Sequence, residues 1–338
     1  MTPFAWTAWL LLQVVPASPD VAMPRAEREA WLMGTRFRIV LEDADRGRAH
    51  RVAETALLEV ERIEALLSTW DAATPLSRVN RSPAGSCTPV ELELEALLLE
   101  ATDWARRTGH AFDPRIGALL DAWDLRGQGR IPDDAQLSEA LGGSGEAGVA
   151  LARHYLTRLS DAAWIDAGGF GKGAALRSAA RRVQAAVPNP RLLMDLGGQL
   201  LALAPADAPW TVEVAHPQDR GQAVAVLAVH DRSVATSGSS ERGRHVLDPR
   251  TGRLVEPWGS VTVIDVDAVA ADVLSTALFV MGPDVGLAWA EEAGVGALFL
   301  RAAAPEVTAT WTSAFEPWLL DAPAEHQPEF HKQVVTDR

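Results

Sequence analysis

The sequence predicts an α+β fold, a single domain in which mixed or antiparallel sheets pack against helices. Of the 338 residues 48% are apolar, which is enough to bury a substantial core. Strand-like segments also follow one another in runs, instead of alternating strictly with helices. The formal charge of −14, without a concentrated basic stripe, argues against a nucleic-acid-binding surface. We expect a folded globular protein that meets anionic ligands through local devices.

The first element is an apolar run at residues 6–15, which precedes Pro16, Ala17 and Ser18. This order of segments is typical of a signal peptide, and the run is too short for a transmembrane helix. A positively charged stretch before the run is missing apart from the amino terminus. We expect residues 1–24 to be a signal peptide that directs export to the periplasm or cell envelope; a cytoplasmic protein is the alternative.

A charged linker at residues 25–29 is expected to precede a strand at 37–41 and a long helix at 49–67. The segment 68–89 is rich in Ser, Pro, Asn and Thr and predicts a loop before a second long helix at 90–107. The glycine-rich stretch 142–148 is interpreted as a flexible surface connection.

From residue 164 onward the sequence predicts a short strand, a glycine-rich turn, a helix at 174–186 and a strand at 191–196. Further strands are expected at 210–215, 223–229, 233–236 and 260–266. Asp267 is expected to cap a helix that runs to Met281, followed by a helix at 283–293 and a last strand at 296–300. Residues 31–305 would form the domain, and 306–338 a C-terminal extension.

The glycine-rich turn at 166–173 contains four glycines and Lys172 between a strand and a helix. Without side chains, the backbone there can approach a phosphate group closely, and Lys172 can add a positive charge. The pattern is neither the Walker nor the Rossmann motif, and a tight structural turn would explain the glycines equally well.

Asp272 and Thr276 lie four residues apart on a predicted helix and therefore share one face. Two hard oxygen ligands on an apolar helix suit magnesium, which also takes water and phosphate oxygens. Alternatively, Asp272 is a first-turn residue whose negative charge interacts favourably with the helix dipole, and the Thr276 hydroxyl donates a hydrogen bond to a backbone carbonyl of its own helix. Cys87 is the only cysteine, which excludes an internal disulfide and a thiolate metal cluster.

Three further polar segments are candidates for ligand contacts. His245 and Asp248 could serve as acid, base or ligand, although the Asp-Pro-Arg-Thr-Gly sequence at 248–252 also predicts a plain turn. Asp113 either binds a ligand or starts a turn. The segment 33–35, Met-Gly-Thr, is a possible ligand-contacting turn before the strand at 37–41.

The order of these motifs resembles the ApbE family, the FAD:protein FMN transferases. Eight segments between about residues 31 and 301 carry the resemblance: 33–35, 67–70 with 76–80, 112–114 with Gly117, 166–173, 195–198, 236–238, 245–252, and 271–272 with Thr276. Two departures stand out. The residues after Thr-Ser-Gly are Ser239, Ser240 and Glu241 where an aromatic is common, and Trp70 occupies a position that is often Tyr.

The resemblance implies roles for individual residues. It assigns Asp272, Thr276 and the backbone carbonyl of Gly169 as magnesium ligands, and Lys172 as a contact to FAD. It places six residues around the flavin nucleotide: Met33, Trp70, Phe112, Asp113, Ser237 and His245.

The reaction implied by the resemblance is attack by a Thr or Ser hydroxyl of an acceptor protein on the FMN phosphorus of FAD, with release of AMP. His245 is a candidate general base, because the pKa of a histidine lies near neutral pH, and Lys172 and Asp272 would stabilise charge at the phosphates. The expected partners are FAD and an acceptor protein, which could belong to a membrane-associated complex. An FAD pyrophosphatase and a non-catalytic FAD-binding protein are the alternatives.

Overall fold

The computed structural model describes residues 24–43, 45–238, 245–303 and 306–320. The expected signal peptide therefore lies, apart from Pro24, outside the described residues. The main element is an eight-stranded antiparallel sheet in the order β1-β2-β6-β7-β10-β11-β12-β13. Its strands are β1 (Arg25–Leu32), β2 (Thr35–Glu42), β6 (Arg191–Leu196), β7 (Gln199–Leu203), β10 (Arg232–Gly238), β11 (Gly259–Asp265), β12 (Gly296–Ala303) and β13 (Glu306–Trp311).

Both faces of the sheet are covered, as the side-chain alternation of its strands requires. In β2, Ile39 and Leu41 face the core beneath the helices, whereas Val40 faces a second core. The second core is closed by a two-stranded hairpin, β8 (Trp210–Ala215) and β9 (Ala223–Val229), in which Trp210 is buried. The predicted α+β class with antiparallel sheets packed against helices is confirmed.

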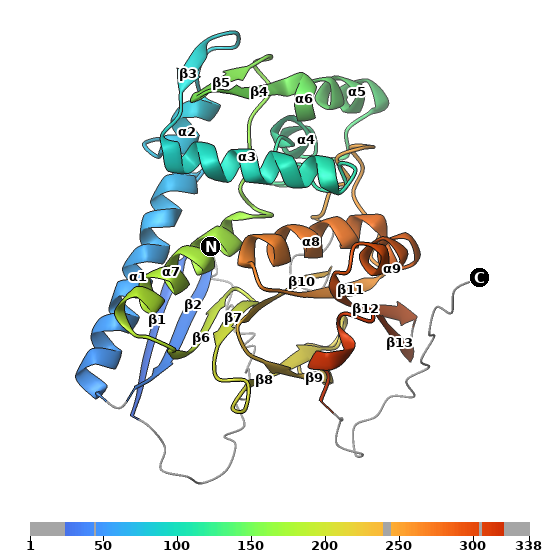
Figure 1. Ribbon diagram of the computed structural model, residues 1–338. Coiled ribbons are helices and arrows are strands. Elements are labelled where there is room, and N and C mark those ends of the chain that lie inside the picture. The colour runs from blue at the N-terminus through green and yellow to red at the C-terminus, as the bar shows by residue number, and fades with distance from the viewer. Residues whose placement is uncertain (1–23, 44, 239–244, 304–305, 321–338) are drawn as a thin grey trace, which may run out of the picture.

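Three long helices pack against the first face: α1 (Arg46–Leu67), α7 (Gly171–Ala186) and α8 (Ala268–Met281). Figure 1 shows α7 and α8 lying across the sheet, with α9 (Pro283–Glu292) beside α8. Asp267 caps α8 as predicted, since its carboxylate accepts hydrogen bonds from the backbone N–H groups of Val269 and Ala270. α8 is apolar on all sides and almost completely buried, which fits its central position.

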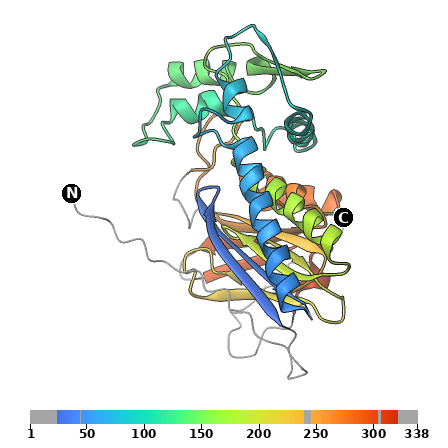
Figure 2. The same cartoon turned by 90° about the vertical axis from the view of Figure 1, so that its left-hand side faces the viewer.

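A smaller lobe lies at the upper end of α1, above α7 and α8 (Figures 1 and 2). It contains a three-stranded sheet, β3 (Cys87–Pro89), β5 (Tyr155–Arg158) and β4 (Val149–Ala152). Its helices are α2 (Pro75–Asn80), α3 (Leu92–Arg107), α4 (Gly117–Ala122), α5 (Asp134–Gly142) and α6 (Gly145–Gly148). Figure 2 shows the long helix α1 extending from the large sheet toward this lobe. None of the helices within the described ranges has the length and apolar character needed to cross a bilayer.

Four local expectations were wrong. Residues 25–29 belong to strand β1, an edge strand whose polar residues face solvent, and the sheet continues into β13 beyond residue 305. The expected strand at Trp164 is extended but pairs with no strand, because the Asn80 side chain binds the backbone N–H and C=O of Ile165. The stretch 142–148 ends α5 and forms α6, and two of its glycines are packed: Gly143 is buried, and a Cβ on Gly148 would lie 2.1 Å from the Gly143 carbonyl oxygen.

Candidate functional site

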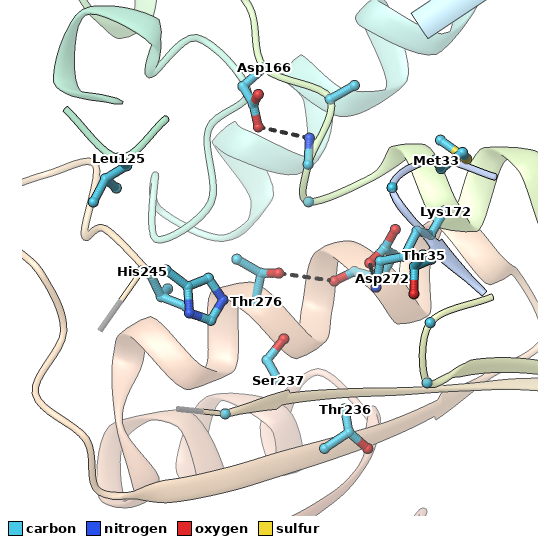
Figure 3. A pocket seen from close by; sticks show the side chains of 18 of the residues that line it. Met33, Thr35, Leu125, Asp166, Lys172, Thr236, Ser237, His245, Asp272 and Thr276 are labelled. Atoms are coloured by element: carbon cyan, nitrogen blue, oxygen red, sulfur yellow. Dashed lines mark hydrogen bonds and ion pairs between the residues drawn. The ribbon is translucent and has the colours of Figure 1, made fainter. Parts of the chain in front are cut away.

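A pocket of about 850 Å³ lies where the small lobe meets one end of the large sheet. Its volume is in the range of sites that hold a whole cofactor. The loops after α1 and α4, the glycine-rich turn, the start of β7, the end of β10 and helix α8 all contribute to its lining. All ten predicted site residues line this pocket. Figure 3 labels six of them: Met33, Lys172, Ser237, His245, Asp272 and Thr276.

Asp272 lies on α8 at the side of the pocket and is only 3% exposed. Its Oδ2 accepts a hydrogen bond from the backbone N–H of Gly173 at 2.9 Å, and its Oδ1 lies 3.6 Å from Nζ of Lys172. A buried carboxylate is tolerated only with such partners. The predicted pairing of the glycine-rich turn with the Asp272 helix is therefore present in the structure.

Gly173 permits this contact. A Cβ at this position would lie 2.2 Å from the carbonyl oxygen of Ala268, so α7 can approach the first turn of α8 only with glycine there. The Gly173 N–H belongs to the first turn of α7, where backbone N–H groups have no partner within the helix. The glycine is thus required by helix packing as well as by the polar contact.

Thr276 is the only residue between 268 and 280 of α8 that is not fully buried. Its hydroxyl donates to the carbonyl oxygen of Asp272 at 3.3 Å, which was the alternative considered for this residue. The glycine-rich turn faces it: a Cβ on Gly169 would lie 3.7 Å from Thr276 Oγ1 and 2.9 Å from Cε2 of Phe112. Gly169, Thr276 and Phe112 therefore lie close together.

Ser237 and His245 line the same part of the pocket. The Ser237 hydroxyl lies 2.9 Å from that of Ser275, and Figure 3 shows His245 beside Thr276. The segment after His245 is the predicted turn, closed by a hydrogen bond from Gly252 N–H to the Asp248 carbonyl oxygen at 2.8 Å. The residues that replace the usual aromatic, 239–241, lie outside the described part of the chain.

Asp113 serves to hold its own loop. Arg115 donates two hydrogen bonds to its carboxylate, both at 2.8 Å, and Nδ1 of His110 lies 3.1 Å away. Burial alone would raise the pKa of Asp113, but the hydrogen bonds and charge of Arg115 outweigh it and hold the pKa below its usual value. Asp113 lines the pocket. Its carboxylate oxygens are already bonded to the Arg115 side chain, and one of them accepts from the Arg115 backbone N–H, which starts the expected turn.

Met33 lies at the tip of the β1–β2 hairpin with a left-handed φ of 52°, a conformation that is uncommon for non-glycine residues. Its backbone N–H donates to Glu64 of α1 at 2.8 Å. Its methyl carbon would be 3.2 Å from a Cβ on Gly171. The hairpin tip thus packs against the beginning of α7, next to Lys172.

Asp195 and Gly198 lie below this point, at the turn between β6 and β7. The Asp195 carboxylate is buried and accepts a hydrogen bond from the Gly198 N–H at 2.9 Å. Burial raises the pKa of Asp195. The hydrogen bond from Gly198 and nearby cations, including Lys172, lower the pKa but only partly offset the effect of burial.

Arg126 is a site residue that sequence reasoning missed. Its guanidinium carbon lies 4.7 Å from the ring centre of Trp70 and 4.2 Å from that of Trp164, and Nη2 donates to Oδ1 of Asp166 at 2.7 Å. Trp70 itself lines the pocket as predicted and is 73% exposed. The only signal in the sequence was an arginine in a turn with Gly127 and Gly129, which is too common to single out.

No group of three or more His, Cys, Asp or Glu side chains within the described ranges is arranged to hold a metal ion. The oxygen atoms of Asp272 and Thr276 are hard donors, suited to a cation that takes most of its ligands from water and phosphate. Together with Lys172 they form a compact charged centre beside a large cavity.

The sequence model of the ApbE family matches residues 33–299. A protein of Treponema pallidum named FAD:protein FMN transferase is 29% identical over 303 residues, covering 81% of this chain and 83% of that protein. A protein of the same name from Salmonella typhimurium is 28% identical over 353 residues, covering 98% and 96%.

Two solved structures have the same fold. The flavinyl transferase ApbE of Pseudomonas stutzeri, in its apo form, has a TM-score of 0.77 at 28% identity, covering 88% of this chain and 98% of that one. The ApbE protein of Thermotoga maritima has a TM-score of 0.79 at 28% identity, covering 87% and 99%. The family match spans more than three quarters of the sequence and includes every predicted site residue. This chain is a member of the ApbE family.

Proposed function

We propose that the protein transfers FMN from FAD to a Thr or Ser hydroxyl of an acceptor protein and releases AMP. The observation that carries this proposal is the contact between the buried carboxylate of Asp272, the ammonium group of Lys172 and the first turn of α7, beside a pocket of about 850 Å³. Its relatives are named FAD:protein FMN transferases, which supports this choice of reaction.

The residues around Asp272 fit a magnesium ion. Asp272, the Thr276 hydroxyl and the Gly169 backbone carbonyl would supply oxygen ligands, and Asp272 Oδ1 has Lys172 Nζ at 3.6 Å, longer than a normal hydrogen bond. Magnesium needs only one or two carboxylates when substrate phosphates and water complete its shell. Bound there, it would supply positive charge to the pyrophosphate of FAD.

The protein's own residues orient and neutralise the reacting groups. The acceptor oxygen forms a bond to the FMN phosphorus, while the bond from that phosphorus to the bridging oxygen breaks and AMP leaves with the electron pair. Lys172, in the glycine-rich turn that lines the pocket, would stabilise the charge that develops on the leaving oxygen, and the Gly173 N–H fixes the Asp272 carboxylate. His245, which lies beside Thr276 in Figure 3, would accept the proton of the acceptor hydroxyl.

The direct test is incubation of the full chain with FAD, magnesium chloride and an acceptor domain. The readouts are flavin fluorescence of the acceptor on a denaturing gel and release of AMP. A fluorescent acceptor band with equimolar AMP supports the proposal. AMP without a band identifies an FAD pyrophosphatase, in which water is the nucleophile, and FAD binding without AMP identifies a binding protein.

The first prediction concerns Asp272. We expect Asp272→Asn to lower AMP release by at least about 100-fold, because the asparagine can still accept from Gly173 but carries no charge. FAD binding, measured by fluorescence, should persist, since the ring contacts are elsewhere in the pocket. The matched control is Asp284→Asn, an aspartate that is 86% exposed at the start of α9. Unchanged AMP release by Asp272→Asn would remove the assignment.

We propose further that the protein acts outside the cytoplasm, because residues 6–18 have the order of a signal peptide. The acceptor would then be an exported or membrane-associated protein with an exposed Thr or Ser. Expression of the full chain followed by cell fractionation and amino-terminal sequencing tests this proposal. A product in the cytoplasm that retains Met1 would contradict it.

A further inference from the structure

Trp70 is a large aromatic side chain that the fold leaves open to the pocket. It follows α1 in a loop, lines the cavity and is 73% exposed. Aromatic side chains are common in the lining of pockets that hold a small molecule. Trp70 has the Arg126 guanidinium group over its ring, at 4.7 Å. A planar ligand could stack on the rest of its exposed surface.

Arg126 joins three segments that are distant in the sequence. Its Nη2 donates to Oγ1 of Thr69 at 2.6 Å and to Oδ1 of Asp166 at 2.7 Å. The guanidinium plane also stacks on Trp164 at 4.2 Å. Only arginine combines a forked donor with a flat face that stacks on aromatics, so lysine could not reproduce these contacts.

The partners of Arg126 are themselves fixed. The indole N–H of Trp164 donates to Asp121 at 2.8 Å, and the ring packs so closely on Gly117 that a Cβ there would lie 2.2 Å from it. Asp166 Oδ2 accepts from the backbone N–H of Gly168 at 2.8 Å, within the glycine-rich turn. Arg126 thus connects the loop that carries Trp70 to the turn that carries Gly169 and Lys172.

We infer that Arg126 is a positioning residue that holds Trp70 as a stacking surface for an aromatic ring of the flavin dinucleotide and fixes the distance of Trp70 from the glycine-rich turn. This inference rests on the proposed function. The ring is either the isoalloxazine or the adenine of FAD, and both are flat and apolar enough to stack. Loss of the Arg126 side chain should therefore weaken FAD binding, but it should have little effect on the rate at which bound FAD reacts.

The experiment compares the full-length variants Arg126→Ala, Arg126→Lys, Trp70→Ala and the double variant Arg126→Ala/Trp70→Ala. FAD binding is titrated by flavin fluorescence, and KM and kcat for AMP release are measured separately. We expect Arg126→Ala to weaken FAD binding about 10-fold, equivalent to about 1.4 kcal/mol. Arg126→Lys should bind FAD almost as weakly as Arg126→Ala does. In the Trp70→Ala background the arginine change should add less than about twofold.

The matched control is Arg107→Ala. Arg107 stacks on Trp104 at 3.9 Å on α3, away from the main pocket, so its loss should leave FAD binding and KM unchanged. Titration with FMN alone and with AMP alone identifies the ring: the ligand whose binding depends on both Arg126 and Trp70 is the one that stacks. Dependence of either ligand supports the inference, and dependence of neither overturns it.

Other results also overturn the inference. They are wild-type affinity in Arg126→Lys, additive effects of the two single changes, or a loss of kcat at unchanged KM. Thermal melting identifies a variant that is unfolded; Arg126→Lys, which keeps the charge, then carries the test. Normal FAD binding by the wild type without transfer removes the proposed reaction alone. Unchanged binding by a folded Arg126→Ala removes the role of Arg126 alone, and a wild type that does not bind FAD removes both.

Discussion

The two ends of the pocket are built differently. One end, the helix pair, consists of α7 and α8 around Asp272, where the critical groups lie on regular helices and Asp272 is 3% exposed. The other end, the aromatic end, consists of Thr69, Trp70, Arg126, Trp164 and Asp166, all on loops, with Trp70 73% exposed. In the proposed reaction, the groups that would act at the phosphorus are held by the core, and the groups that would recognise a ring are held by side-chain contacts between loops.

This difference leads to different expectations for substitutions. Changes in the helix pair should affect stability and turnover together, because the same contacts serve both. Changes in the aromatic end should separate them, because its loops are held by a small number of ion pairs and stacked rings that can be removed one at a time. The predictions below test that separation.

The largest effect is expected at the loop that supports the aromatic end. Asp113→Asn would leave the Arg115 guanidinium, which is 6% exposed, without its carboxylate, at an expected cost of about 3–5 kcal/mol in the free energy of unfolding. The loop also carries Pro114, whose carbonyl oxygen accepts from Asp166 N–H at 2.8 Å. Denaturant unfolding at pH 7 measures the loss.

The pH dependence of the same pair has a definite sign. The pKa of Asp113 is lowered in the fold, so its stabilisation is complete above the unfolded value of about 3.9 and is lost as the pH falls through the lower folded pKa. Asp113→Asn should remove that acid-dependent loss. The control is Asp103→Asn, whose partner Arg106 lies 3.6 Å away and is exposed, with an expected effect of less than about 1 kcal/mol. Equal effects at both positions would contradict a structural role for Asp113.

A smaller effect on stability, but a larger effect on turnover, is expected in the helix pair. The added methyl group in Gly173→Ala would lie 2.2 Å from the Ala268 carbonyl oxygen, so α7 and α8 must separate, at a cost of about 1–3 kcal/mol. The hydrogen bond from Gly173 to Asp272 would lengthen at the same time, and AMP release should fall. Unfolding and AMP release are measured on the same preparation.

Gly142→Ala is the matched control for this prediction. Gly142 ends α5, and an added Cβ has no atom within 4 Å, so the change should be neutral or slightly stabilising. A Gly173→Ala variant that unfolds like the wild type and releases AMP at the wild-type rate would show that the two helices are not held as tightly as their distance indicates.

The same division explains what the sequence could predict. The boundaries of α8 were predicted within a residue, because Asp267 is a good cap and the apolar run that follows is long. Asp272, Thr276 and the glycine-rich turn were identified because they are short local patterns. Their contact across about a hundred residues was expected only from the resemblance to the ApbE family, since spacing alone left a plain turn and a back-bonded threonine as alternatives.

The aromatic end could be predicted only in part. Arg126 contacts Thr69, which lies 57 positions before it, and Asp166, which lies 40 positions after it. Periodic sequence patterns do not predict contacts between residues so far apart in the chain. Strand β1 was missed because its exposed positions are charged and one of its buried positions is only an alanine, which gives a weak alternation. Asp113 was expected to contact the ligand, and in the structure its carboxylate accepts hydrogen bonds from Arg115.

The smallest effect is expected at Asp195, which lies beneath the helix pair at the end of β6. Burial raises its pKa, so the folded protein binds this proton more tightly than the unfolded chain does. The free energy of unfolding therefore falls as the pH rises from about 3.9 through the raised folded pKa, and the loss persists at pH 7. Asp195→Asn can still accept from Gly198 N–H and should remove that loss.

We expect Asp195→Asn to match the wild type near pH 3 and to be slightly more stable at pH 7, by less than Gly173→Ala costs. The control is Asp231→Asn, an aspartate that is 61% exposed in the β9–β10 turn, where the loss of an exposed charge should change the free energy of unfolding by less than about 1 kcal/mol. If Asp195→Asn were less stable than the wild type at pH 7, the negative charge of Asp195 would be stabilising the fold through its attraction to Lys172. The helix pair would then depend on the sheet end electrostatically, in addition to the packing of α7 on α8.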